Sequence, residues 1–462
     1  MQNYLTDVWE LSFTYAAGML NIWNGISMIL PLFFLFLVDA LIGNFTMLVV
    51  SSISYTLGIG LVAMSTPPVL ANWTGTCKQY EPQCIGHAQK VLFYTGMSLL
   101  AVGISGYNVS LTPFLKEQDE NYSPDADVDD NRDSDSYDSD ENEDEDLDDV
   151  DYFQVVLIPV IAAIALPYIK SWSLAFGIPA ISSAIATSVF LTGSFKYRKA
   201  ERIRRWELLS GTQIGTTEFA VRTIPMWMTF IVCGIVTSTG NTYFIEQANR
   251  MDRKLGSWNP PIELLLLLSG YSREGVAFVA EKYPKKLESF ISIPTIIADA
   301  MIFSVLCCIT AAKVETRRIN VITRHGLLDK PNEEIPMKVG WLYPQFALLS
   351  IMDVGIEMAV ASLTKKFECP GSVRKYIVCF AKGVCGVGFM CGVLSVYAVG
   401  EVSEIGGKTN WFQFTLNRSR LDRYYWVLAG LTSLTLVLFV HVAWCYKCIY
   451  RQGMIDPASN DE

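Results

Sequence analysis

Long uninterrupted runs of apolar residues constrain the fold of this chain more than any other feature. A run of about 18 to 25 such residues, as a helix, crosses the roughly 30 Å hydrocarbon core of a bilayer. Strands of a membrane barrel alternate over about ten residues, so runs of this kind fit helices only. Eleven runs are found, at residues 16–42, 46–66, 91–114, 152–169, 173–193, 224–245, 262–280, 290–312, 340–363, 376–400 and 425–446. The expected fold class is therefore an all-α polytopic membrane protein with about 11 transmembrane helices.

The distribution of charge supports this fold class. Hydrophobic residues make up 51% of the chain and charged residues 18%, against about 25% charged residues in soluble domains. Residues 117–151 hold 19 of the 46 acidic residues and one basic residue, Arg132. In the rest of the chain, 35 Lys and Arg residues exceed 27 Asp and Glu residues by 8, so the net charge of -10 reflects one segment. The composition excludes a soluble enzyme and a nucleic-acid binder.

A basic cluster, KYRKAERIRR at residues 196–205, divides the spans into five before it and six after it. The expected organisation is an N-terminal transmembrane half (1–195) with an acidic, disordered cytosolic loop (117–151), a basic central cytosolic loop (196–218), a C-terminal transmembrane half (219–450) and a cytosolic tail (451–462). If the positive-inside rule is applied to the basic cluster, the N-terminus lies outside and the C-terminus inside.

This orientation places two glycosylation sequons on the non-cytosolic side. They make Asn72 and Asn417 the candidate acceptors. Cys77 and Cys84 lie beside the first sequon, in a compartment that favours a disulfide between them. We expect no metal site and no cofactor, because the three His residues are scattered and no Gly-rich phosphate loop is present.

Seven stretches, taken in order, resemble the plant nitrate/peptide transporter family, part of the proton-dependent oligopeptide transporters of the major facilitator superfamily. These stretches are NIWNGISMILPLFFLFLVDALIG (21–43), SSISYTLGIGLVAMSTPPVL (51–70), WSLAFGIPAISSAIATSVFLTGSFKYR (172–198), TIPMWMTFIVCGIVTSTGNTYFIEQ (223–247), AAKVETRRI (311–319), PMKVGWLYPQFALL (336–349) and WFQFTLNRSRLDRYYWVLAGLTSL (411–434). The resemblance implies a bundle of two six-helix halves, a cavity alternately open to each side, and proton symport in typical members. The implied partners are the lipid bilayer, a small-molecule solute and protons, with no nucleic acid. The implied location is the plasma membrane or the vacuolar membrane.

Three elements of the family's ionic machinery differ here. The family's first helix carries Glu-x-x-Glu-Arg, whereas residues 3–6 of this chain resemble the end of that helix, so the first helix looks absent and the spans number 5 + 6. The family's Gly-x-Gly-Gly-x-Lys places Asn108 where the lysine would lie. The typical Thr-Gln-Val-Glu-Glu-x-Lys is altered at residues 212–218, and a histidine of some nitrate carriers would fall near Thr237. These departures argue against inherited proton coupling.

Ionisable residues within a span are functional candidates, because they are costly in lipid. Asp353 aligns with a cavity glutamate of the family, and Glu357 follows one helical turn later on the same face. Lys382 lies deep in a span and would need an acidic partner or a solute anion. We predict that Asp353, Glu357, Lys382 and Asn108 line a cavity that handles solute or protons. The alternative for Asp353 is a packed, paired carboxylate without a transport role.

Asp39 matches the acidic position of the superfamily's cytoplasmic motif, and Gly43 allows the tight turn that follows it. A carboxylate near a helix end can stabilise one state of an alternating cycle. Asp39 and Gly43 are therefore gating candidates, and the alternative for Asp39 is an ordinary helix-end carboxylate.

The predicted function is secondary active transport of a small solute, such as nitrate, a peptide or another metabolite, by alternating access. The alternative is a transport-incompetent or regulatory membrane protein of the same descent. An enzyme is not expected, because no nucleophile and base pair stands in a recognisable context.

Overall fold

The structure is a computed structural model that describes residues 1–75, 77–118, 160–165, 168–169, 171–197, 216–254, 256, 258–282, 292–331, 333–366 and 371–453. Two compact units divide the chain. The first comprises Met1–Thr212, Arg253–Leu268 and Thr364–Gly386, and the second comprises Gln213–Asp252, Ser269–Leu363 and Val387–Glu462. Three helices contribute to both units: α12 (Ile262–Lys282), the last residues of α15 (Tyr343–Lys366), and α16 (Gly371–Ser403).

Helices make up the described part of both units, apart from one short pair of strands. The first unit contains α1 (Gln2–Asp7), α2 (Phe13–Leu37), η1 (Val38–Ile42), α3 (Gly43–Met64), α4 (Pro67–Thr74), η2 (Pro82–Cys84), α5 (His87–Gln118), α8 (Trp172–Thr192) and η4 (Gly193–Phe195). The second unit contains α10 (Thr216–Thr239), η5 (Gly240–Phe244), α11 (Ile245–Arg250), β1 (Met251–Asp252), α14 (Ile293–Arg324), β2 (Ile335–Lys338), η6 (Val339–Leu342), α15 (Tyr343–Lys366), η7 (Leu416–Arg418) and α17 (Leu421–Gly453). Strands β1 and β2 pair in parallel.

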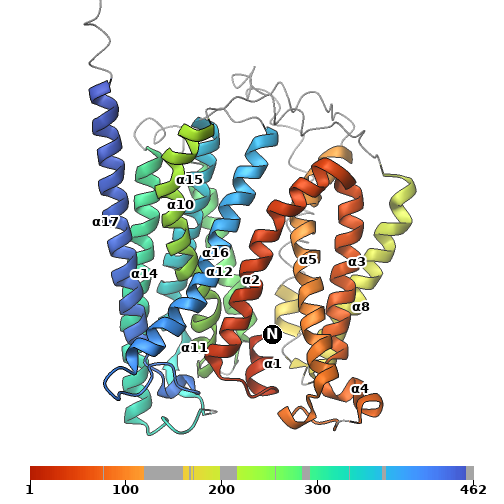
Figure 1. Cartoon of the computed structure of the whole chain (residues 1–462). Coiled ribbons are helices and arrows are strands. Elements are labelled where there is room, and N and C mark those ends of the chain that lie inside the picture. Colours follow the sequence, from red (N-terminus) through yellow and green to blue (C-terminus); the bar gives the residue numbers. More distant parts are fainter. Residues whose placement is uncertain are drawn as a thin grey trace, which may run out of the picture. The chain divides into compact units, whose positions relative to one another are not determined.

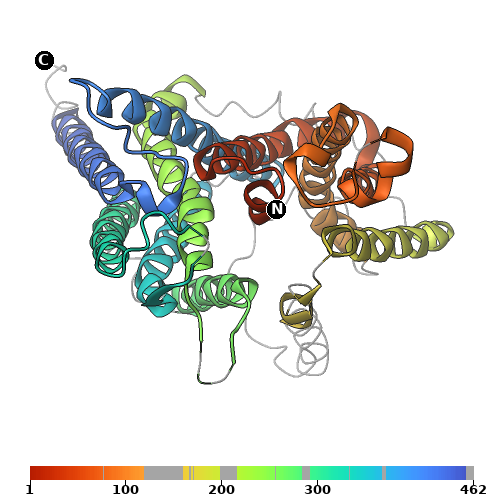
Figure 2. The ribbon, with the colours of Figure 1, turned by 90° about the horizontal axis from the view of Figure 1, so that it is seen from below.

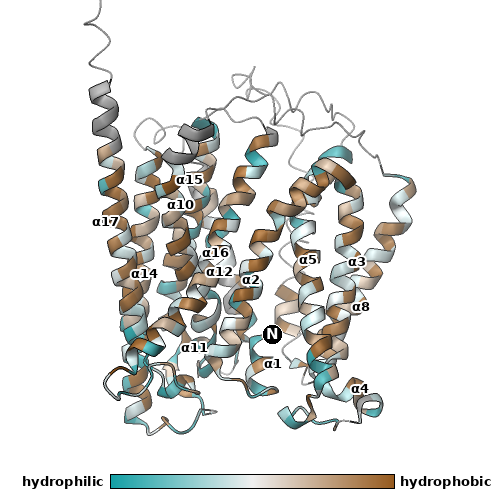
Figure 3. Ribbon diagram, viewed as in Figure 1, coloured by the Kyte–Doolittle hydropathy of each residue, from teal (hydrophilic) through white to brown (hydrophobic). Residues whose placement is uncertain are grey.

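Eight helical stretches of the described residues are long and apolar enough to cross a membrane. They are Phe13–Met64, His87–Gln118, Trp172–Phe195, Thr223–Arg250, Ile293–Arg324, Val339–Lys366, Val373–Ser403 and Leu421–Cys445. Figure 3 shows hydrophobic residues along these helices and hydrophilic residues gathered near their ends and in the connecting loops. The stretches contain nine of the eleven predicted runs, because runs 16–42 and 46–66 fall in one helical stretch.

The two remaining runs have different outcomes. Run 262–280 is helical as part of α12, but α12 is not among the eight stretches, because it carries Glu263, Arg273 and Glu274. Run 152–169 lies mostly outside the described residues, as do nearly all of the acidic segment 117–151 and most of the basic loop 196–218.

In the first unit, α3 lies beside α5 and α8 (Figures 1 and 2). Glycines let α3 and α5 approach closely. A Cβ on Gly58 would lie 2.9 Å from the carbonyl oxygen of Gly96, and one on Gly103 would lie 2.8 Å from the backbone nitrogen of Tyr55. Small residues at such contacts are typical of helix packing in membranes, where close backbone approach replaces the hydrophobic driving force.

The short helix α1 belongs to the core of the first unit. Tyr4 and Leu5 are 0% exposed. The ring of Tyr4 lies 5.4 Å from the rings of Trp172 and Phe176 of α8, measured between centroids, and 6.1 Å from that of Phe93 of α5. Residues 3–6 therefore act as a packing element that joins α5 and α8.

In the second unit, α14 packs along α17 (Figure 1). A buried polar network ties the end of α14 to its neighbours. Arg318 and Glu315 are both 0% exposed, and Nε of Arg318 donates to Oε2 of Glu315 at 2.7 Å. Gln247 of α11 donates to the same carboxylate at 2.6 Å, and Arg318 also donates to Asn417 at 3.4 Å. A buried ion pair is tolerated when further hydrogen bonds satisfy it, as they do here.

Candidate functional site

A carboxylate on α15 and a hydroxyl on α10 meet within the second unit. Thr237 donates a hydrogen bond to Oδ1 of Asp353 at 3.0 Å. Both side chains are half-buried. The Thr237 hydroxyl also lies 3.2 Å from the Cys233 carbonyl oxygen of its own helix, so one proton has two acceptors. Two positions that the sequence analysis treated separately are thus in direct contact.

Glu357 lies one turn after Asp353 and pairs with a cation from α12. Its carboxylate forms an ion pair with Arg273. The side chains are 37% exposed for Arg273 and 51% for Glu357, so water reaches both charges. A second link joins the same two helices, since the hydroxyls of Ser272 and Tyr343 lie 3.2 Å apart. We call Thr237, Asp353, Glu357 and Arg273 the α15 cluster.

The α15 cluster holds two carboxylates and one guanidinium. Arg273 is engaged by Glu357, whereas the partner of Asp353 among the described residues is a neutral hydroxyl. Such an arrangement suits a protonated amine or an exchangeable proton at Asp353. Arg273 was missed by the sequence analysis, which included it in an apolar span. An arginine within that run was the signal that could have identified it.

A second contact involves the gating candidates and lies within the first unit. Asp39 belongs to η1, a π-helical segment at the end of α2, and its Oδ2 accepts a hydrogen bond from Tyr376 of α16 at 3.1 Å. Gly43 ends this segment with φ of +73°, a conformation that favours glycine. Asn44 donates to Glu117 of α5 at 2.6 Å. Single-turn π segments are frequent at functional sites.

Two other cavity candidates are exposed. Lys382, predicted to lie deep in a span and to require a partner, lies within the stretch Val373–Ser403 with its side chain exposed, and its partner stays a prediction. Asn108 is likewise exposed on α5. Neither residue belongs to the α15 cluster.

The two predicted glycosylation acceptors differ in accessibility. Asn72 is exposed at the end of α4. Asn417 is 3% exposed, and its Nδ2 donates to the carbonyl oxygen of Leu327 at 3.0 Å. Asn417 is thus a structural residue of the folded second unit, which leaves Asn72 as the accessible acceptor.

Cys77 and Cys84 are joined by a disulfide, with their Cα atoms 4.9 Å apart. Between them, the Tyr80 hydroxyl lies 2.9 Å from that of Ser171 and 3.2 Å from that of Ser173, at the start of α8. Burial raises the pKa of the Tyr80 phenol, but the hydrogen bonds to these serines outweigh burial and hold the pKa below its usual range. The disulfide loop is therefore fastened to α8.

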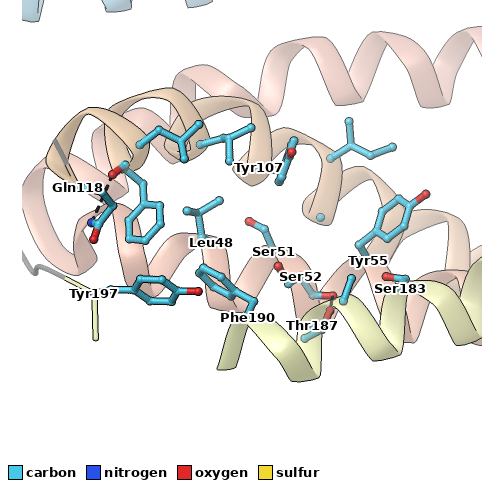
Figure 4. Close-up of a pocket in the computed structure, with 16 residues that line it drawn as sticks. Leu48, Ser51, Ser52, Tyr55, Tyr107, Gln118, Ser183, Thr187, Phe190 and Tyr197 are labelled. Carbon is cyan, nitrogen blue, oxygen red and sulfur yellow. Dashed lines mark hydrogen bonds between the residues drawn. The ribbon is translucent and has the colours of Figure 1, made fainter. Parts of the chain in front are cut away.

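The first unit also contains a pocket of about 650 Å³ between α3, α5 and α8. Figure 4 shows Ser51, Tyr55 and Tyr107 around it, with Phe190 and Tyr197 opposite. Its described lining is mostly apolar and includes no carboxylate and no cationic side chain. This pocket therefore offers no group that could handle a charged solute, which leaves the α15 cluster as the candidate site.

Comparisons with known proteins agree with the helical architecture. A model of the POT family (PTR2) matches residues 45–206. Protein NRT1/PTR FAMILY 5.5 of Arabidopsis thaliana is 32% identical over 97% of this chain and 94% of that protein. An auto-inhibited POT family peptide transporter has a similar structure, with a TM-score of 0.62, 16% identity, and coverage of 96% of this chain and 93% of that chain. A mutant of the peptide transporter POT in complex with alafosfalin gives a TM-score of 0.61 and 11% identity, with 93% and 86% covered.

Proposed function

Because the chain belongs to the NRT1/PTR family of POT-type transporters, we propose that it carries a small amino-bearing solute across a membrane by alternating access. The chain is a multi-pass membrane transporter, and its family and fold are not those of an enzyme. The observation that supports this class of solute is the contact between Thr237 and Asp353, which are the residues proposed to handle it.

The Thr237–Asp353 contact accommodates two protonation states. With Asp353 charged, the hydroxyl of Thr237 donates to the carboxylate. With Asp353 protonated, the carboxyl group donates to the Thr237 oxygen, and the Thr237 proton turns to the Cys233 carbonyl 3.2 Å away. Neither change requires a helix to move. Asp353 is therefore suited to exchange a proton or to bind an amine.

The second carboxylate and the arginine set a preference between solute classes. A zwitterion, such as a peptide, places its amine at Asp353 and its carboxylate at Arg273, in competition with Glu357. Nitrate has no hydrogen-bond donor that could bind Asp353. At Arg273 it would also be repelled by two carboxylates, those of Asp353 and Glu357. We therefore favour an amino-bearing solute over nitrate. Since Asn108 stands where the family has a lysine, proton coupling at this cluster would depend on Asp353.

Asp39 and Tyr376 are proposed as part of a gate. Their hydrogen bond joins the end of α2 to the first half of α16 across 3.1 Å. A single hydrogen bond to a charged group contributes about 1.5 to 3 kcal/mol, which is small enough to break in each transport cycle. The turn at Gly43 sets the point at which the chain turns away from the Asp39–Tyr376 contact.

The proposed orientation follows from the basic cluster and the disulfide loop. The segments 117–151, 196–218 and 451–462 face the cytosol, and Asn72 and the Cys77–Cys84 loop face the other side. The plasma membrane and the vacuolar membrane are the two proposed locations.

Uptake by proteoliposomes containing the full chain tests the proposal. The panel comprises a radiolabelled dipeptide, 5-aminolevulinic acid and [15N]nitrate, each at the same concentration. We expect saturable uptake of an amino compound that exceeds nitrate uptake. Nitrate uptake as fast as that of the amino compounds would contradict the solute preference. Protein that is folded but carries no member of the panel would favour the alternative, a transport-incompetent or regulatory protein.

A further inference from the structure

A basic hollow lies in the second unit where α14 ends and α15 is about to begin. Its volume is about 490 Å³, and its lining includes Lys313, Arg317, Asn320 and Arg324 of α14 and Trp341 of η6. The four α14 residues are exposed. This hollow is separate from the α15 cluster, since the two share no residue.

The three cations form one stripe along α14. Arg317 follows Lys313 by four residues and Arg324 follows Arg317 by seven, so all three return to the same face of the helix. Arg318, one residue after Arg317, points into the core and is bound to Glu315. The helix thus separates a buried, neutralised arginine from three exposed cations.

Among the residues that the structure describes, the cations of the stripe have no acidic partner. None of the ion pairs formed by the described residues involves Lys313, Arg317 or Arg324. The guanidinium carbon of Arg317 lies 3.9 Å from the ring centroid of Trp341, which holds this cation in place. Three neighbouring positive charges favour the binding of an anion.

The position of the stripe along α14 indicates the source of that anion. The helix begins at Ile293, and Asp299 is the one charged residue of its first 20 residues, 293–312. Twenty helical residues span about 30 Å, the thickness of the hydrocarbon core. Lys313 therefore falls where hydrocarbon gives way to headgroups. Trp341, 45% exposed, is also of the residue type that concentrates at this depth.

We propose that this hollow binds the phosphate headgroup of an anionic membrane phospholipid. Lys313 and Arg317 contact the phosphate, Arg324 adds a third charge nearer the water, and the ring of Trp341 keeps Arg317 extended toward the headgroup. A Lys or Arg near a membrane surface adds about 1 kcal/mol of attraction to anionic headgroups. In the proposed orientation these headgroups belong to the non-cytosolic leaflet, because the end of α14 contacts Asn417.

Lipid retention by the purified full chain tests this site. Native mass spectrometry measures phosphatidylglycerol and phosphatidylcholine bound after exchange in mixed micelles, and thermal unfolding is followed with each lipid or with inorganic phosphate. The test variant is Lys313→Gln/Arg317→Gln/Arg324→Gln. The control, Lys330→Gln/Lys408→Gln/Arg423→Gln, removes three exposed cations elsewhere in the same unit. Each protein is compared with its own lipid-free unfolding curve, so a change in basal stability does not obscure binding.

We expect wild type and control to bind phosphatidylglycerol in preference to phosphatidylcholine and to be stabilised by it. In the test variant, phosphatidylglycerol binding should weaken about fivefold for each charge removed. Unchanged retention by the test variant would overturn the proposal. Equal stabilisation by inorganic phosphate at the same concentration would also overturn it, because the site would then serve a soluble anion.

Discussion

The hydroxyl of Thr237 on α10 lies 3.0 Å from a carboxylate oxygen of Asp353 on α15, and it joins two helices of the second unit at an ionisable group. One turn further along α15, Glu357 reaches Arg273 of α12. Three helices thus converge on one polar cluster through side chains that are costly in lipid unless they serve a purpose.

Replacing Thr237 by valine should impair transport without unfolding the protein. Thr237→Val keeps the shape of the side chain and removes the donor to Asp353, a loss of about 1.5 to 3 kcal/mol or about tenfold or more in rate. Uptake of the amino compound identified in the solute panel measures the effect. Thr435→Val is the control, because this hydroxyl bonds the backbone of its own helix at Leu431. Equal uptake by both variants would argue against a role for the Thr237 contact.

The Arg273–Glu357 pair should matter for solute binding more than for stability. Both side chains are partly exposed, and pairs of this kind contribute about 0.2 to 1 kcal/mol. We expect Arg273→Gln to raise KM with a small change in Tm. The exchange Arg273→Glu/Glu357→Arg should recover part of the affinity. A double-mutant cycle of KM values measures the coupling, and strictly additive effects would show that the two charges act independently.

Breaking the buried ion pair on α14 should affect the stability of the protein more than its solute binding. In Glu315→Gln the charge of Arg318 remains buried and unpaired, which should destabilise the second unit by about 3 to 5 kcal/mol. Thermal unfolding in detergent measures this loss. Arg317→Gln, at the neighbouring exposed position, is the matched control and should change Tm little. Comparable losses in both variants would contradict the assignment of Arg318 as the structural cation.

Glycosylation should distinguish Asn72 from Asn417. Asn72 is exposed, whereas the Asn417 amide is buried in hydrogen bonds. In cells that glycosylate the protein, Asn72→Gln should abolish the glycosidase-sensitive mass shift and Asn417→Gln should leave it unchanged in whatever protein still folds. A shift that survives Asn72→Gln but is lost in Asn417→Gln would show that Asn417 is the acceptor and would contradict its assignment as a buried structural residue.

Local patterns in the sequence account for much of the fold. Nine of the eleven apolar runs fall in the eight membrane-length helical stretches, because a membrane helix satisfies its backbone within one segment. The charge of Asp353 within such a run identified it in the same way. Contacts between distant segments were not predictable from local pattern. Arg273 was assigned to an apolar span, and nothing in its neighbourhood in sequence indicated Glu357.

Tertiary packing determines which side chains are buried, and this explains the remaining differences between the sequence-based predictions and the structure. The Asn417 sequon is a local motif, and only the proximity of α14 shows that its amide is engaged by Leu327 and Arg318. The distance of Lys382 from the ends of its apolar run placed it along the span Val373–Ser403, but could not show that its side chain is exposed on α16. A position along a helix does not determine which face a residue occupies.

We infer that solute movement depends on the carboxylate of Asp353. The most direct measurement is uptake of the amino compound by proteoliposomes containing wild type, Asp353→Asn or Asp329→Asn, with and without an inward proton gradient. Asp329 pairs with Arg418 at the surface and supplies the matched control. We predict that Asp353→Asn lowers uptake about tenfold or more and removes any response to the gradient, while the control behaves as wild type. Uptake by Asp353→Asn at the wild-type rate, with the same response to the gradient, would show that transport does not require the Asp353 carboxylate.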